Sequence, residues 1–297
     1  MALSALHLAH LHHDDRHYSA TSARHWDAAL RGASAELASP SAHPDSIYAL
    51  YAFAVTSCFY TLARGPQQAG DLLVCVVDDG AAGGRTTADW LVLYHGVRSL
   101  IDLSSDRVLD GPLAPLSSHA RRQLRRNRRS KPGGGGGGGG GITTASAEEG
   151  EGERGKEGGG RSSSGSSAAL RKLRLQMDRD DDEPNLGTYE KAVDSLEFAW
   201  EVVEAEERRG GGGALAASFQ AFFWLYRVSD DFVLCLQQRQ PMALVIYAHF
   251  VVLIKTMDWT WIIGNWPSHL IAQIYGSLDE SWRVRVRWPM EQVSWQP

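Results

Sequence analysis

A run of nine glycines, Gly133–Gly141, constrains the fold of this chain more than any other feature of its sequence. It lies in a low-complexity segment, residues 117–185, which begins with the basic cluster Arg121–Lys131 and ends with the acidic run Asp178–Glu183. Such a composition offers too little apolar surface to offset the entropy cost of ordering the backbone. We therefore predict that this segment is a disordered insertion.

The two flanks of the insertion, residues 1–116 and 186–297, are rich in apolar residues that recur with helical periodicity. Each flank alone looks too small and too apolar to be an independent domain, so we predict that they are the first and second parts of one helical domain. The predicted fold class is all-α, an irregular helical bundle interrupted by the insertion.

We predict the helices from the spacing of apolar residues and from the glycine and proline residues that end them. They cover residues 2–13, 19–37, 46–63, 90–101, 189–208, 215–228, 231–238, 242–257 and 268–278. No hairpin signal flanks the apolar run LLVCVV, so we do not expect a strand there. Met1 opens directly into a helix without a cap, which indicates a truncated fragment or a missing upstream exon, unless it is a simple helical start.

Composition and cysteine spacing narrow the class of protein. A formal net charge of −5 gives no general reason to expect nucleic-acid binding. Cys58, Cys75 and Cys235 lie far apart in apolar stretches, which favours buried thiols over a disulfide framework or a cysteine zinc site. The longest apolar run, Met242–Ile254, has 13 residues and contains His249, so we expect no membrane span.

The N-terminal histidines are the first candidate metal ligands. They are His7, His10, His12, His13 and His17. His13 and His17 have the spacing of one helix face, but the aspartates between them favour a helix break and no third ligand has a defined spacing. We therefore interpret them as a solvated helix end, and we expect no metal.

Acidic runs raise the alternative of a magnesium-dependent, all-α isoprenoid enzyme. The candidates are Asp178–Glu183 and Asp230–Asp231, but DDFVLC lacks the third carboxylate of a DDxxD motif. There is also no GxSxG motif and no phosphate loop ending in GK[ST]. We expect a protein that is not an enzyme and needs no cofactor.

Two further features leave alternatives open. The basic cluster at Arg121–Arg129 fits a nuclear-import signal and a solvated charge run equally well. Six of the ten tryptophans fall between Trp259 and Trp295, beside the most apolar helix. Such an aromatic cluster either lines a pocket for a large apolar ligand or forms packed core.

Five pieces of the chain, in order, resemble the regulatory domain of fungal zinc binuclear-cluster transcription factors, especially the sterol uptake control proteins. They are ALSALHLAHL, YSATSARHWDAALRGASAEL, IYALYAFAVTSCFYTLA, WLVLYHGVRSLID and ALVIYAHFVVLIKTMDWTWIIGNWPSHLIAQIYGSLDESWRVRVRWP. The resemblance implies a nuclear regulator of RNA polymerase II transcription. It also implies DNA binding through an N-terminal six-cysteine zinc cluster, which these residues lack.

The best-studied members of that group bind ergosterol in a hydrophobic pocket. Carried onto this chain, the resemblance implies a ligand site whose residues are Tyr247, Phe250, Ile254, Trp259, Trp261, Gly264 and Trp266. The expected partners are a sterol or another apolar ligand, the transcription machinery, or a second copy through a helical face. The rival interpretation from a different class is a helical interaction scaffold without a ligand.

Overall fold

A computed structural model describes residues 1–12, 16–38, 46–77, 85–88, 91–92, 95, 163–177, 184–208, 220–221, 224–225 and 227–297. The predicted all-α fold class is confirmed across them. The elements are α1 (Ala2–Leu11), α2 (Arg16–Ala38), α3 (Ser46–Arg64), β1 (Cys75–Val77), β2 (Arg85–Thr87), α7 (Ser163–Met177), α8 (Leu186–Arg208), α10 (Asp230–Gln237), α11 (Pro241–Lys255), α12 (Trp266–Ser277), α13 (Glu280–Arg283), η1 (Val284–Val286) and α14 (Arg287–Val293).

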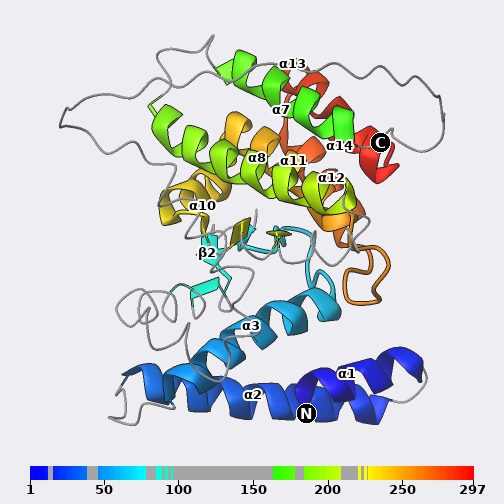
Figure 1. The fold of residues 1–297 in the computed structure, drawn as a ribbon. Coiled ribbons are helices and arrows are strands. Elements are labelled where there is room, and N and C mark those ends of the chain that lie inside the picture. Colours follow the sequence, from blue (N-terminus) through cyan, green and yellow to red (C-terminus); the bar gives the residue numbers. More distant parts are fainter. Residues whose placement is uncertain are drawn as a thin grey trace, which may run out of the picture.

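The helices stack in layers, with the α1–α2 pair at one end and α7 at the other (Figure 1). Helix α1 packs along α2 and also contacts α3. The buried hydroxyl of Ser22 on α2 donates a hydrogen bond of 2.8 Å to the carbonyl of Ala2, which fixes the start of α1 against its neighbour. Most of the helices after the insertion gather around α11.

Helix α11 forms the centre of the core. All its residues from Met242 to Ile254 are buried, so it is apolar on every side, as expected of a helix that other elements surround. Pro241 stands in the first turn, where a missing N–H costs nothing. Helices α8, α10, α12 and α14 pack against it, and α7 reaches it from the outside.

A two-stranded antiparallel hairpin corrects the expectation for LLVCVV. Strand β1 pairs with β2 in the register Cys75–Thr87 to Val77–Arg85. The expectation was wrong because residues 78–84 connect these strands, which is longer than the short turns that mark a hairpin in a sequence. Leu72 to Cys75 are buried, so the hairpin contributes apolar side chains to the core.

Helix α7 corrects the predicted extent of the low-complexity insertion. Residues 163–177 fall within the segment 117–185, yet they form a helix. The Ser/Gly composition of its first half hid the stripe of Leu170, Leu173 and Met177, which are all buried. The rest of that segment up to residue 183 lies outside the described residues, as do the basic cluster and the acidic run.

Residues from both flanks of the insertion contribute to one hydrophobic core. The hydroxyl of Tyr247 on α11 donates a hydrogen bond of 2.6 Å to the carbonyl of Leu72. The amide of Gln237 on α10 donates one of 3.0 Å to the hydroxyl of Thr87 on β2. Polar bonds and apolar packing therefore join the N-terminal and C-terminal parts.

Element boundaries differ from expectation in a few places. Helix α1 ends at Leu11 instead of residue 13, and α12 begins at Trp266, since Pro267 suits its first turn. The short helices after Leu278 were not predicted. Most of the helices expected at 90–101 and 215–228 lies outside the described residues. Within the described part of the chain, no helix combines the length and apolarity needed to cross a bilayer.

Candidate functional site

The tryptophan-rich loop between α11 and α12 is built from tight turns. The backbone N–H of Asp258 donates to the carbonyl of Lys255 at 3.1 Å, and that of Thr260 donates to Met257 at 3.0 Å. The side chains of Lys255 and Asp258 form an ion pair across the first turn. The carboxylate of Asp258 offsets the positive charge of Lys255, the last residue of α11, and the pair holds the loop close to the helix.

The second half of the loop turns the chain into α12. The hydroxyl of Thr260 accepts a hydrogen bond of 3.0 Å from the N–H of Ile262. Gly264 has a φ of +50°, a left-handed conformation that glycine adopts without strain. Ile263 and Trp266, on either side of it, are fully buried and anchor the turn to the core.

A cavity of about 400 Å³ lies over this loop. Its lining residues are His10, Lys255, Asp258, Trp259, Thr260, Trp261, Gly264, Pro267 and Ser268. The lining combines flat apolar rings with an ion pair and two hydroxyl groups. Trp259 is 60% exposed, so one wall faces solvent. Such a site suits an amphipathic ligand that has both a flat apolar face and hydrogen-bonding groups.

Helix α1 reaches this loop from the other end of the sequence. The imidazole of His7 stacks on the indole of Trp261 with ring centroids 4.9 Å apart and an interplanar angle of 10°. His10, one turn further along α1, stacks on the same indole at 5.1 Å and 24°. Trp261 therefore connects the cavity to the α1–α2 pair.

The predicted ligand-site residues divide into two groups. Trp259, Trp261 and Gly264 line the cavity together. Tyr247, Phe250, Ile254 and Trp266 instead pack in the core, each at most 2% exposed.

Protein groups cover the aromatic residues of that second group. The ring of Phe250 stacks on Trp224 at 4.1 Å. The indole N–H of Trp266 donates to the carbonyl of Leu62 at 2.9 Å. Tyr247 lies beside Phe250, with ring centroids 5.5 Å apart. The sequence placed all seven residues at one site, whereas the fold turns the loop residues outward and these side chains inward.

Burial keeps the Tyr247 phenol and the Cys75 thiol uncharged at neutral pH. Burial raises the pKa of the Tyr247 phenol well above its usual value, and electrostatic interactions with Cys75 and Asp71 act in the same direction. Burial, with a smaller effect of Asp71, raises the pKa of the Cys75 thiol to about 12. These groups act as packing and hydrogen-bonding elements.

His249 is the ionisable group most relevant to stability. Burial lowers the pKa of its imidazole to about 4, and the hydrogen bond to Val245 only partly opposes this effect. Its Nδ1–H donates to the Val245 carbonyl at 2.9 Å, and its ring stacks on Trp288 at 5.4 Å. The imidazole is therefore held neutral inside the bundle.

Of the acidic residues considered for magnesium binding, Asp230 and Asp231 do not line the cavity, and Asp178–Glu183 lie outside the described residues. Asp230 and Asp231 stand in the first turn of α10, where Ser229 caps the helix and accepts from the N–H of Phe232 at 3.2 Å. Both carboxylates are exposed, and Asp230 pairs with His95 at 3.0 Å. In the part of the chain that the structure describes, no group of three or more His, Cys, Asp or Glu side chains could hold a metal ion.

Several lining residues were not predicted. The spacing of Lys255 and Asp258 is a recognisable signal for an ion pair at a helix end. Thr260 lies between two predicted residues, Ser268 follows Trp266 by two positions, and neither carries another signal. His10 was interpreted as part of a solvated helix end, and nothing in the sequence indicates its stacking on an aromatic ring 251 residues away in the numbering.

Fold and site together define an all-α protein with a solvent-facing cavity lined by tryptophan side chains. The chain matches no protein-family profile, no curated protein and no solved structure. Its function must therefore be argued from its own residues.

Proposed function

We propose that this chain is a ligand- or partner-sensing regulatory module of a fungal RNA polymerase II transcription factor, without the zinc-cluster domain that would bind DNA. The observation that carries the proposal is the cavity beside Trp261, because the same indole stacks on His7 of α1. The family resemblance of the five helical segments supports it. We place the protein in the nucleus.

The proposed mechanism is a shift between two arrangements of the α1–α2 pair. A ligand in the cavity contacts Trp261, whose other contacts include His7 and His10. If the ligand binds better when the indole leaves the imidazoles, its binding loosens α1. A ligand shifts the equilibrium only by its difference in affinity for the two arrangements. The surface uncovered or hidden in this way would regulate contacts with the transcription machinery.

A sterol or a molecule of similar shape fits the proposed ligand class. Its flat ring system would lie against Trp259 and Trp261, while its hydroxyl group would reach Ser268 or the carboxylate of Asp258. The proposal assigns no catalytic residue and no cofactor. Tyr247 and Phe250 are buried in the core and do not line the cavity.

Sterol binding tests the proposal directly. A fluorescent sterol added to the full chain should bind saturably at micromolar concentration, and Trp261→Ala should weaken binding by about tenfold. The matched control is Trp295→Ala, since that indole packs against Tyr275 at 5.4 Å and does not line the cavity. An absence of saturable binding, or equal losses in both variants, would contradict a sterol site.

A reporter assay tests the regulatory role. The full chain is fused to an unrelated DNA-binding domain and expressed in a fungal host that carries the matching reporter gene. We expect reporter activity that changes with sterol supply and no longer changes in Trp261→Ala. A fusion that never alters reporter output would rule out the role in transcription.

The ligand-free scaffold is the second candidate, and the packed aromatic core favours it. Trp224 contacts the rings of Phe250 at 4.1 Å and Phe232 at 5.8 Å, so aromatic side chains of the protein pack against this indole. Reporter activity that does not depend on sterol supply, together with an absence of sterol binding, would favour the ligand-free scaffold.

A further inference from the structure

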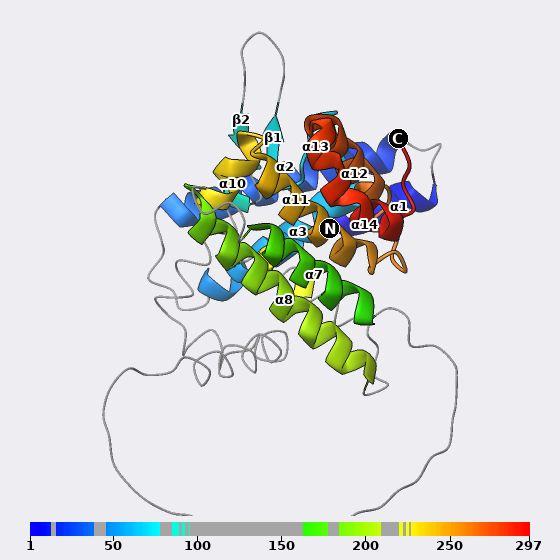
Figure 2. The same cartoon turned by 90° about the horizontal axis from the view of Figure 1, so that it is seen from above.

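Helix α7 packs along α8 (Figure 2), and the start of α7 contacts the end of α8, so the two helices run antiparallel. Near its C-terminal end, Arg174 contacts Glu197 in the middle of α8. Near its N-terminal end, Ser166 contacts Glu204 close to the end of α8. Polar contacts therefore hold both ends of α7, and an apolar seam lies between them.

The apolar seam consists of a few side chains at helical spacing. Leu170, Leu173 and Met177 follow one another at intervals of three and four residues, and none is more than 2% exposed. The opposite side of α7 is polar apart from Leu175, which is 63% exposed. This is the pattern of an amphipathic helix that lies in a groove.

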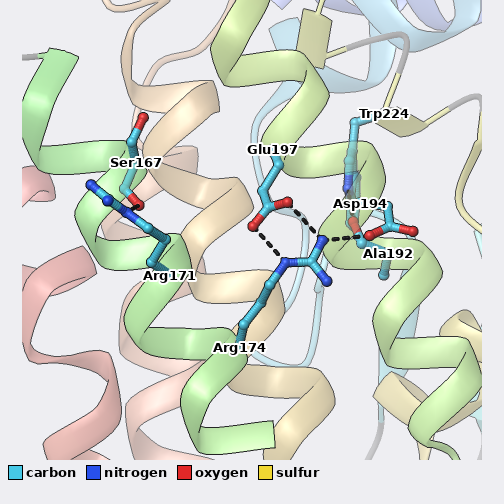
Figure 3. A network of polar contacts seen from close by, with 7 residues as sticks. All are labelled: Ser167, Arg171, Arg174, Ala192, Asp194, Glu197 and Trp224. Carbon is cyan, nitrogen blue, oxygen red and sulfur yellow. Dashed lines mark hydrogen bonds and ion pairs between the residues drawn. The ribbon is translucent and has the colours of Figure 1, made fainter. Parts of the chain in front are cut away.

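Arg174 forms the strongest polar contact between the two helices (Figure 3). Its Nε donates to one oxygen of Glu197 at 2.7 Å and its Nη2 to the other at 2.6 Å, a bidentate arrangement. The same Nη2 also donates to Asp194. The hydrogen bonds to Glu197 are the main reason that the pKa of the guanidinium is raised.

The other end of α7 uses neutral donors on a carboxylate. The hydroxyls of Ser166 and Ser167 both donate to Oε1 of Glu204, at 2.8 Å and 3.2 Å. Two donors on one oxygen stabilise a carboxylate that is only half-buried. Glu204 therefore belongs to the contact surface for α7.

The carboxylates that α7 contacts belong to a longer acidic ridge on α8. Its members are Glu190, Asp194, Glu197, Glu201 and Glu204. They recur every three or four residues, so they lie along one side of the helix and repel one another. Of the three cations of α7, Arg174 contacts this ridge, at Glu197 and Asp194, whereas Arg171 is exposed and donates to the carbonyl of Ser167 in its own helix.

We propose that the face of α8 beneath α7 is a docking groove for a basic amphipathic helix of a partner protein, and that α7 is its built-in competitor. The partner helix would carry apolar residues at the spacing of Leu170, Leu173 and Met177, and an arginine at the position of Arg174. Charge complementarity with the acidic ridge identifies this occupant. The groove is separate from the tryptophan-lined cavity and does not depend on a sterol.

Competition predicts that weakening α7 in the chain opens the groove. The probe is a fluorescent peptide with the sequence of Ser163–Met177, and the acceptors are the full chain and its Leu173→Asp variant. The peptide should bind the variant about tenfold more tightly, because the chain's own α7 no longer occupies the groove. Chain variant Arg174→Glu, which leaves the apolar seam intact, should also bind the peptide more tightly than the unaltered chain.

The charge pair supplies a matched control. A peptide that carries Arg174→Glu should lose about tenfold in affinity for the Leu173→Asp chain. Adding Glu197→Arg to that chain should restore binding of the altered peptide and weaken binding of the original one. Circular dichroism of each chain verifies that the remaining helices are folded.

Three outcomes would overturn the proposal. In the first, the peptide binds neither folded variant, and in the second it binds all chains equally. In the third, charge reversal at Glu197 does not change the affinity for either peptide. A chain that instead dimerises by exchanging α7, with a doubled mass in light scattering, would assign the groove to a second copy and remove the partner helix.

Discussion

The indole N–H of Trp266 on α12 donates a hydrogen bond of 2.9 Å to the carbonyl of Leu62 on α3, across 204 residues of sequence. Leu62 lies in the last turn of α3, where carbonyl groups have no partner within the helix. The same carbonyl also accepts from the N–H of Gly65 at 3.0 Å. The hydrogen bond therefore links the last turn of α3 to the first residue of α12, and it joins the two flanks of the insertion.

Replacing Trp266 with Phe should destabilise the chain by about 2 kcal/mol. The variant loses one of the two hydrogen bonds to Leu62 and leaves part of a fully buried site empty. Equilibrium urea unfolding, followed by far-ultraviolet circular dichroism, measures the change in the free energy of unfolding.

Trp259→Phe is the matched control for that measurement. Its indole is 60% exposed, so the free energy of unfolding should change by no more than about 0.5 kcal/mol. Equal losses in the two variants would mean that Trp266 does not join the flanks as described.

The sequence predicted the helices with strong apolar periodicity. Helix α11 was expected at 242–257 and spans Pro241–Lys255, and α10 was expected at 231–238 and spans Asp230–Gln237. Both have apolar faces that are wide enough to be recognised without tertiary information. Helix α7 was not predicted because its Ser/Gly half resembles a linker. Its apolar residues Leu170, Leu173 and Met177 are recognisable as a helix face only once their packing against α8 is known.

The sequence predicted only those residues of the cavity that lie close together in the sequence. Trp259, Trp261 and Gly264 are neighbours in sequence and share the cavity. Sequence proximity also grouped them with Tyr247 and Phe250, but a helix buried on every side turns those rings into the core. The stacking of His7 on Trp261 is a long-range packing result, and a single sequence carries no pattern for it.

Acid should destabilise the protein through His249. Its pKa is about 4 in the folded chain, below the ordinary value near 6.5, so the unfolded chain binds the proton more readily. The stability that neutral His249 provides is complete above about pH 6.5 and is lost as the pH falls toward 4. Lowering the pH from about 7 to about 5 should cost about 2 kcal/mol from this group.

Unfolding of the His249→Phe variant isolates that contribution. Phe keeps a ring to pack on Trp288 and cannot bind a proton, so its free energy of unfolding should depend less on pH than that of the unaltered chain. Parallel pH profiles for the two proteins would show that His249 is not the group that titrates.

The cysteine thiols should be unreactive until the chain unfolds. Cys58, Cys75 and Cys235 are all buried thiols that form no disulfide, and burial raises the pKa of Cys58 well above the usual value. Because the thiolate is the reactive form, Ellman's reagent near neutral pH should label the native chain slowly. All three thiols should react rapidly in urea. Fast labelling of a thiol under native conditions would contradict its burial.

Gly264→Ala and Gly32→Ala should change stability in opposite directions. Gly264 has a φ of +50°, and the nearest atom to an added Cβ is the Trp261 carbonyl oxygen at 4.0 Å, so its cost is backbone strain of about 1 kcal/mol rather than a clash. Gly32 lies inside α2 with nothing within 4 Å of an added Cβ, so alanine should stabilise the chain by up to about 1 kcal/mol. Thermal unfolding of both variants measures the two effects, and sterol titration of Gly264→Ala reports whether the loop still forms the cavity. A stabilised Gly264→Ala variant would mean that the loop does not adopt the left-handed turn on which the cavity depends.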